Sequence, residues 1–450
     1  MPTSTGSVTV IGGGLAGCEA AWQLATRGVA VTLMEMRPEV MTPAHTSGDL
    51  AELVCSNSLK SEDAQTAAGL LKAELELLGS MVLSVAREQR VPAGGALAVD
   101  RARFSAEVTR RVEEHPLITL QRGEASAIPD GPVIIATGPL SSASIEAALS
   151  AIVGAERLAF FDAAAPIVDE QSMDRSIVFA ASRYGKGETA DYLNAPMTRE
   201  EYDVFYGALV GAARVHEKDF ERRELFSACQ PVEEVARSGR DALRFGALKP
   251  VGLEDPRTGV RPWAVVQLRA ENASGSAYNL VGFQTNLTFP EQRRVFRLIP
   301  GLEDAEFFRY GVMHRNTFVD APRVLDATLS VRATPRVRLA GQLTGTEGYV
   351  EAVASGLLAG LNTFAAVVGG EPAILPVTTA FGALVAYATD PMTTKYQPMH
   401  VNFGIIPPLK ERVRGKRERY AAYSHRALSD LRAWLARRDD LRFAGGHFDG

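Results

Sequence analysis

The sequence VTVIGGGLAG at residues 8–17 joins an apolar run to a glycine-rich turn. Residues 16–25 continue with helix-like spacing, and a second apolar run, residues 29–34, ends at Glu35. This order predicts a strand, a tight turn, a helix and a second strand that ends in an acid, which is typical of a dinucleotide-binding βαβ unit. A tight turn without a ligand is the alternative interpretation of the same glycines.

Each glycine of the turn has an expected role. Gly12 permits the turn, Gly14 lets the backbone approach a pyrophosphate, and Gly17 lets the helix and strand pack closely. Free N–H groups at the helix start attract phosphate, and Glu35 is placed to accept hydrogen bonds from ribose hydroxyls. The candidate dinucleotide-binding residues of this unit are Gly12, Gly13, Gly14, Leu15, Ala16, Gly17, Glu35 and Arg37.

Length and composition are those of a soluble globular protein with two or three structural units. Of 450 residues, 46% are hydrophobic and 22% are charged, and the first residues do not have the pattern of a signal peptide. Residues 352–368 are weakly polar but contain Ser355, Asn362 and Thr363, so we expect a packed helix and not a membrane span. These features predict a cytoplasmic protein that does not bind membranes.

The three cysteines, Cys18, Cys55 and Cys229, are odd in number and widely spaced. Such usage suits a reducing cytosol, and the spacing does not match a zinc site. We therefore expect no bound metal.

Later stretches indicate how the first unit continues. An apolar strand at residues 132–138 ends in Ala-Thr-Gly, and another at residues 337–341 leads into a glycine-bearing turn and a long helix. Between them, residues 184–325 mix helical and short β-like runs, which is typical of an α+β insertion. We predict an α/β protein with a discontinuous Rossmann-like dinucleotide-binding domain, residues 1–185 and 326–450, and an inserted α+β domain, residues 186–325.

Three glycine-marked strand ends, at Gly12, Gly138 and Gly341, are expected to converge on one cofactor. We favour FAD because flavoproteins commonly use a strand, turn and helix near the carboxyl end to reach the isoalloxazine ring. A second complete glycine fingerprint for NAD is absent from the sequence, so NAD(P)H is expected to bind transiently. Further candidate cofactor-binding residues are Thr137, Gly138, Gly341, Gln342 and Tyr349.

Five motifs resemble the folate- and FAD-dependent tRNA (uracil-5-)-methyltransferases of bacteria. They are VCSNSLKS at residues 54–61, CQPVE at 229–233, KPVGL at 249–253, MHRNT at 313–317 and AGQLTG at 340–345. The resemblance extends from about residue 8 to about residue 409. The last motif is shared with a related flavoprotein that modifies wobble uridines.

The chain departs from the family pattern at two places. Ala228 and Gln230 flank Cys229, where the family is expected to have glycine before the cysteine and a small apolar residue after it. Ala195 stands where relatives often have a cysteine. The first difference concerns the pocket for the target base, and the second leaves no fourth thiol.

The resemblance implies formation of 5-methyluridine at position 54 in the T loop of tRNA. The one-carbon unit would come from methylenetetrahydrofolate, with reduced FAD as carrier and reductant. Uracil C5 becomes nucleophilic after a thiolate adds to C6, and a base must then remove the C5 proton. By resemblance, Cys229 is the nucleophile and Cys55, in a loop at residues 38–61, is the general base.

The resemblance also implies roles for three polar residues. Lys60 and Arg315 are candidate cations that lower a cysteine pKa or bind substrate, and His314 is a candidate to stack on the folate ring. A hydrogen-bonded structural histidine is the alternative for His314. For Tyr349, packing on the flavin and an ordinary position at a helix start are both open.

The net charge of −5 hides a basic carboxyl end, because residues 410–442 contain eleven Lys or Arg and five Asp or Glu. This stretch is either a footprint for a polyanion such as tRNA or a solvated helix with internal salt bridges. Arginines at 222, 223, 237, 240, 293, 294 and 297 are further candidate phosphate contacts. A ribosomal-RNA target, a generic FAD oxidoreductase and a non-catalytic RNA-binding factor remain alternatives.

Overall fold

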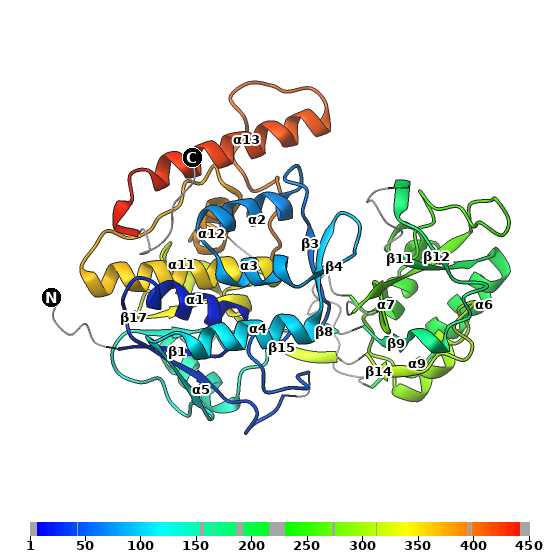
Figure 1. The fold of residues 1–450 in the computed structure, drawn as a ribbon, viewed down its shortest axis with the longest axis horizontal. Coiled ribbons are helices and arrows are strands. Elements are labelled where there is room, and N and C mark those ends of the chain that lie inside the picture. Colours follow the sequence, from blue (N-terminus) through cyan, green and yellow to red (C-terminus); the bar gives the residue numbers. More distant parts are fainter. Residues whose placement is uncertain are drawn as a thin grey trace.

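The computed structural model describes residues 7–42, 44–153, 157–163, 165–185, 192–215, 230–271, 275–311, 313–393, 396 and 398–441. Within 157–163 and 313–317 it describes the backbone alone. The molecule consists of two units, seen at the two sides of Figure 1, with a two-stranded ladder between them.

The first unit is built on a six-stranded sheet in which β1 (Val8–Ile11) holds a central position. The strand order is β16–β17–β7–β1–β2–β6, and the five strands from β17 to β6 run parallel. Their bounds are β2 (Val31–Glu35), β6 (Ile118–Arg122), β7 (Val133–Ile135), β16 (Ser330–Val331) and β17 (Thr334–Leu339). β17 pairs with β7, although the whole second unit lies between these two strands in the sequence. The predicted discontinuous Rossmann-like fold is therefore confirmed.

Helices α1 (Leu15–Ala25) and α11 (Tyr349–Val368) lie side by side in this unit (Figure 1). A Cβ added at Gly356 would lie 2.2 Å from the carbonyl oxygen of Ala16, so the two backbones meet without a side chain between them. Although α11 is long and apolar enough to cross a membrane, 78% of its most apolar stretch is buried within the protein. It is a packed core helix, as the sequence predicts.

The second unit, green in Figure 1, has an antiparallel six-stranded sheet in the order β10–β11–β12–β13–β9–β14. It has a hydrophobic core of its own, in which the ring of Phe283 packs on Phe205 and Phe296. Its elements are β9 (Ile167–Asp169), β10 (Phe179–Ala180), β11 (Tyr192–Met197), α6 (Arg199–Gly211), α7 (Val232–Arg237), α8 (Ala242–Phe245), β12 (Ala264–Ala270), β13 (Ala277–Leu280), α9 (Phe289–Phe296) and β14 (Phe307–Arg309). The expected domain boundary at residue 186 falls inside this sheet, between β10 and β11.

The two units are joined by β8 (Arg157–Ala163) and β15 (Met313–Val319), which form an antiparallel ladder between them (Figure 1). A small sheet, β3 (Ser58–Ser61), β5 (Ala96–Val99) and β4 (Arg90–Val91), belongs to the first unit, so the expected loop at residues 38–61 ends in a strand. The remaining helices are α2 (Ala67–Leu77), α3 (Met81–Glu88), α4 (Arg101–Glu114), α5 (Ala143–Val153), α10 (Ala321–Val324), α12 (Ala380–Thr389) and α13 (Lys416–Leu435).

A buried carboxyl group ties α2 to α12. Glu74 is fully buried and accepts hydrogen bonds from the N–H groups of Ala380 and Phe381, both at 2.8 Å, at the start of α12. These bonds favour the carboxylate, but burial outweighs them and raises the pKa of Glu74 to about 7. The folded protein therefore binds a proton that the unfolded chain has lost between pH 4.5 and 7.

Glu74→Gln tests this linkage. Because the pKa of Glu74 is raised in the folded state, its stabilising contribution to the free energy of unfolding is present below pH 4.5. This contribution is lost as the pH rises through 7. The free energy of unfolding of the variant, relative to wild type, should increase by about 3 kcal/mol between pH 4.5 and pH 7.5. Urea unfolding across this range measures the difference. Glu76→Gln, at an exposed position of the same helix, should follow the wild-type profile, and parallel profiles for all three proteins would contradict the assignment.

Candidate functional site

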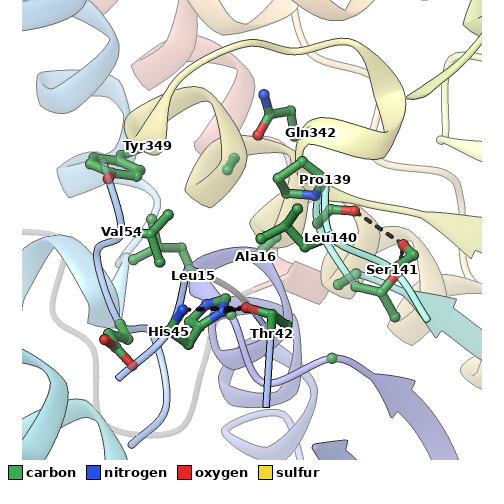
Figure 2. A pocket seen from close by; sticks show the side chains of 18 of the residues that line it. Leu15, Ala16, Thr42, His45, Val54, Pro139, Leu140, Ser141, Gln342 and Tyr349 are labelled. Carbon is green, nitrogen blue, oxygen red and sulfur yellow. Dashed lines mark hydrogen bonds between the residues drawn. The ribbon is translucent and has the colours of Figure 1, made fainter. Parts of the chain in front are cut away.

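A cavity of about 440 Å³ opens at the carboxyl ends of the parallel strands of the first unit. Ligands of open α/β sheets bind at this edge. Its walls come from the turn between β1 and α1, the end of β2, the loop that carries Cys55, residues 136–142 after β7 and residues 341–352 after β17. Figure 2 shows Leu15 and Ala16 between the segment of Thr42 and His45 and the segment of Gln342 and Tyr349.

The glycine turn has space for a ligand at one position and none at the others. A Cβ added at Gly12, whose φ is +104°, would lie 2.6 Å from the carbonyl oxygen of Ala136. At Gly17 the Cβ would lie 1.8 Å from the carbonyl oxygen of Gly12. At Gly14, which lines the cavity, it would meet no protein atom within 4 Å. Gly12 and Gly17 are therefore required by packing, whereas Gly14 leaves an open cradle.

Glu35 is fixed on the cavity wall by backbone and side-chain donors. Its Oε2 accepts the N–H of Gly13 at 2.7 Å, and its Oε1 accepts the backbone N–H and the Nε–H of Arg37, both at 2.9 Å. Burial alone raises the pKa of Glu35, but the charge and hydrogen bonds of Arg37 outweigh burial and lower it. The carboxylate is thus ionised and pre-oriented at the end of β2. Arg37 also donates to Glu52 at 3.3 Å.

Most of the predicted cofactor-binding residues lie on this one cavity. Thr137 hydrogen-bonds to Ser141 at 2.6 Å, and Gln342 donates to Glu347 at 2.7 Å. The predicted residues on the wall are Gly12, Gly14, Leu15, Ala16, Glu35, Arg37, Thr137, Gly138, Gly341, Gln342 and Tyr349, together with Cys55 and Lys60. Gly13 and Gly17 support the turn from behind.

Cys55 and Tyr349 are in direct contact on the cavity wall. The phenol oxygen of Tyr349 accepts the N–H groups of Cys55 at 2.9 Å and of Ser56 at 3.1 Å, and it lies 2.9 Å from the Sγ of Cys55. With both lone pairs occupied, the phenol directs its own hydrogen to the sulfur. Burial raises the pKa of Tyr349 well above its usual range, so the phenol keeps that hydrogen. An O–H donor to sulfur favours the thiolate.

The side chain of Lys60 is directed to partners other than Cys55. Its Nζ donates to the Oε1 of Glu351 at 3.1 Å and lies 2.7 Å from the Nδ1 of His400. Glu351, in the first turn of α11, is fully buried. Burial, followed by the charge of Lys60, lowers the pKa of His400. These contacts direct the ammonium of Lys60, on the cavity wall, to the buried Glu351 and to His400.

The contacts around Cys55 include residues that sequence analysis missed. Arg101, the first residue of α4, donates to the carbonyl of Leu53 at 2.6 Å. Arg269, on β12 of the second unit, donates to the Oγ of Ser56 at 2.6 Å and to the Oδ1 of Asn57 at 2.8 Å. No sequence pattern connects these arginines with Cys55, because they are distant in sequence and meet it only through the fold.

His45 on the cavity wall was also missed. Its Nδ1 is 2.5 Å from the hydroxyl of Thr42 (Figure 2). Burial, and then the charge of Arg37, lower the pKa of His45 to about 4, so its imidazole is neutral at pH 7. A histidine in the Thr- and Pro-containing first part of the loop at residues 38–61 was the available signal.

Three predicted site residues have side chains that the structure does not describe. Cys229 lies outside the described residues, as do its neighbours Ala228 and residues 222–223. His314 and Arg315 are described by their backbone in β15, where His314 pairs with Asp162 of β8. Among the described residues, no group of three or more His, Cys, Asp or Glu side chains is arranged to hold a metal ion.

Comparison with known proteins defines the class first. Residues 7–371 match the model of the family described as Glucose inhibited division protein A. The structure of Aquifex aeolicus GidA superimposes with a TM-score of 0.70 at 17% identity, covering 97% of this chain and 74% of that one. At this identity the likeness concerns the fold, which it confirms.

Two relatives are much more similar in sequence, and both are named Methylenetetrahydrofolate–tRNA-(uracil-5-)-methyltransferase TrmFO. That of Geobacter sulfurreducens is 56% identical over 433 residues, which cover 96% of this chain and 99% of the relative. That of Moorella thermoacetica is 58% identical over 422 residues, 94% and 96% of the two chains. The chain therefore belongs to the Glucose inhibited division protein A family and, within it, to the methylenetetrahydrofolate–tRNA-(uracil-5-)-methyltransferases. The resemblance found in the sequence is confirmed.

Gly14→Ala and Gly17→Ala separate ligand binding from folding. Alanine at 14 meets no protein atom, so the variant should keep the wild-type melting temperature but lose affinity for the expected FAD by at least about tenfold, since its methyl group occupies the cradle. Alanine at 17 overlaps the Gly12 carbonyl and should lower the melting temperature of the flavin-free protein by several degrees. Calorimetry and flavin fluorescence titration measure both effects. Unchanged flavin affinity in Gly14→Ala would show that the cradle is not the binding site.

Proposed function

We propose that this protein forms 5-methyluridine in tRNA, with methylenetetrahydrofolate as carbon donor, FAD as cofactor and NAD(P)H as transient reductant. The names of the close relatives support the substrates. The observation that carries the proposal is the position of the Cys55 thiol, which lies on the wall of the same cavity as the open glycine turn, with its Sγ 2.9 Å from the phenol oxygen of Tyr349. A dinucleotide cofactor and a reactive thiol are thus combined in one site.

The residues of the cavity fit FAD. Gly14 leaves space beside the N-terminus of α1, where free N–H groups attract a pyrophosphate, and Glu35 presents an ionised carboxylate for ribose hydroxyls. We assign the flavin end to the segments of Gly138, Gly341 and Tyr349. Bound FAD in its reduced form would supply electrons and carry the one-carbon unit.

The cysteines have separate proposed tasks. The thiolate of Cys229 adds to C6 of the target uracil, which makes C5 nucleophilic, and Cys55 removes the C5 proton after the carbon has been attached. Cys229 is assigned from the family motif alone. For Cys55 the O–H of Tyr349 supports a thiolate, which is the form that accepts a proton.

The finer substrate assignment follows the family. We place the methyl group at position 54 of the T loop and the protein in the cytoplasm, and we assign folate stacking to His314 and substrate contacts to Lys60 and Arg315. The same chemistry on a ribosomal-RNA uridine is the alternative target. We also propose that the inserted domain comprises about residues 157–319, because β9 and β10 already belong to its sheet.

The proposal is tested by incubating the purified protein with an unmodified tRNA transcript, ¹⁴C-labelled methylenetetrahydrofolate and NADPH, followed by nucleoside analysis. Labelled 5-methyluridine should form, and Cys55→Ala should reduce its rate by roughly 10²-fold or more, since the base is lost. Cys18→Ala, which changes a fully buried thiol, is the matched control and should retain activity. A transcript with cytidine at position 54 should remain unlabelled.

Two outcomes would redirect the assignment. Label in a ribosomal-RNA fragment but not in tRNA would support the alternative target. Oxidation of NADPH by the flavin-loaded protein without labelled nucleoside in either RNA would indicate a generic FAD oxidoreductase.

A basic segment, residues 410–419, supports the RNA partner. Its six cations, Lys410, Arg412, Arg414, Lys416, Arg417 and Arg419, are exposed, and none forms an ion pair with another described residue. Arginines of α4 behave differently, because Arg110 and Arg111 both pair with Glu107. Of the two interpretations of the basic carboxyl end, this segment favours the footprint for a polyanion. Exposed cations that form no ion pair with a described residue are typical of a phosphate-binding surface.

The basic segment is anchored close to the cavity. Phe403, three residues after His400 on the cavity wall, stacks on Tyr420 of α13 with ring centroids 4.3 Å apart. A second contact is made by Arg417, which donates to the side chain of Gln65. Gln65 is five residues after Lys60, which lines the cavity. An RNA whose base enters the cavity can therefore reach these cations with its backbone.

Arg412→Gln/Arg414→Gln/Lys416→Gln tests this surface. With up to three fewer phosphates neutralised, tRNA binding should weaken about tenfold or more, and the slope of log K against log salt should become shallower by roughly 0.7–0.9 for each of these phosphates. Filter binding at several salt concentrations measures both. The control Arg90→Gln/Arg103→Gln/Arg110→Gln removes the same charge elsewhere and should bind nearly as wild type. Equally weakened tRNA binding in the two triple variants would show that only the net charge of the protein matters, and it would contradict a specific role of this segment.

A further inference from the structure

The loop that carries Cys55 is held from both sides by arginines, of which Arg101 is partly buried and Arg269 is buried. Before the thiol, the Nη1 of Arg101 donates to the carbonyl oxygens of Leu53 at 2.6 Å and of Val54 at 3.4 Å. After it, Arg269 donates to Ser56 and Asn57. The side chain of Asn57 in turn donates to the carbonyl of Ala270 on β12 at 2.7 Å. The conformation at the thiol therefore depends on both units.

Arg101 is also part of a buried ion pair between the units. Its Nε contacts the Oε2 of Glu271, which directly follows β12, and the side chains are only 16% and 7% exposed. Burial by itself lowers the pKa of Arg101, but the charge and hydrogen bonding of Glu271, together with the contributions of Tyr349 and Cys55, outweigh burial and raise it. Arg101 is therefore a permanent cation in a site of low dielectric, where a nearby thiolate is stabilised more strongly than in water.

Several charged or titratable groups face Cys55. They are Tyr349 from α11, Arg101 from α4, Arg269 and Glu271 from β12 and its end, Arg309 from β14, and Glu52 from the same loop. Burial, and then the charge of Arg101, lower the pKa of Arg309, while Cys55 opposes both. Arg269 bonds to the neutral side chains of Ser56 and Asn57, so its contacts fix the loop after the thiol. Among these groups, Arg101 combines a fixed charge with bonds to the two residues that precede the thiol.

We propose that Arg101 is a positioning residue for Cys55, which orders the loop through the carbonyls of Leu53 and Val54 and supplies the positive charge that favours the thiolate. Glu271 of the second unit limits this effect, because its carboxylate neutralises part of the same charge. Docking of the second unit on the first thus sets the reactivity of the thiol. The inference rests on the proposed role of Cys55, but thiol reactivity is measured without RNA, folate or turnover.

The test is the pH dependence of alkylation of Cys55 by iodoacetamide, in which the thiolate forms an S–C bond and iodide leaves. The flavin-loaded protein is used in a Cys229→Ala background, and Cys18 is fully buried with a pKa raised by burial, so Cys55 is the thiol that reacts. Arg101→Gln should raise the midpoint by about one pH unit, which is a tenfold slower reaction near pH 7. Arg101→Lys should bring the midpoint most of the way back to the wild-type value, and Glu271→Gln should lower the midpoint below it.

Arg103→Gln is the matched control, because Arg103 lies in the first turn of the same helix with a side chain that is 70% exposed. An unchanged midpoint in Arg101→Gln, or an equal shift in Arg103→Gln, overturns the inference. If Arg101→Gln does not fold, Glu271→Gln decides, and an unchanged or raised midpoint there overturns it. The wild-type methylation assay tests the proposed function separately, so each can fail without the other.

Discussion

The contact between the glycine turn and the sheet is the constraint on which the site depends. The carbonyl of Gly12 lies against Gly17 of α1, and Gly12 itself lies against Ala136 at the end of β7, with no room for a Cβ at either glycine. Close approach places the N-terminus of α1 directly at the edge of the sheet. On the far side of α1, Gly356 lets α11 approach in the same way. Two backbone contacts therefore set the distance between β1, α1 and α11, and the cavity is the space that they leave.

Charges on the cavity wall are held by pairing, because an unpaired charge is costly where water is excluded. At one end, Arg37 lies between Glu35 and Glu52. Next to the start of α11, Lys60 pairs with the fully buried Glu351. These pairs cost desolvation, and in return they fix the direction of each side chain. The cavity thus presents oriented polar groups along a mostly apolar wall.

The site is shared unequally between the two units. The glycine turn, Cys55 and Tyr349 belong to the first unit, which has the parallel sheet. The second unit contributes Arg269, which lines the cavity and bonds to the Cys55 loop, and Glu271, which pairs with Arg101. Because these contacts cross the interface, the thiol is in its described environment only when the units are docked.

Structural features with a local cause could be predicted from the order of the amino acids alone. The order of apolar run, glycines and acid predicted β1, α1 and β2, and the apolar strand expected at residues 132–138 contains β7. The cavity residues Gly12, Glu35, Thr137 and Gly341 could be predicted because carboxyl ends of parallel strands meet at one edge. The folded arrangement was needed to show that β9 and β10 join the second sheet, and that Arg101, with its partner Glu271, and Arg269 hold the Cys55 loop. Long-range pairing of charges leaves no periodic or motif signal in the chain, because it depends on which faces come together when the two units pack.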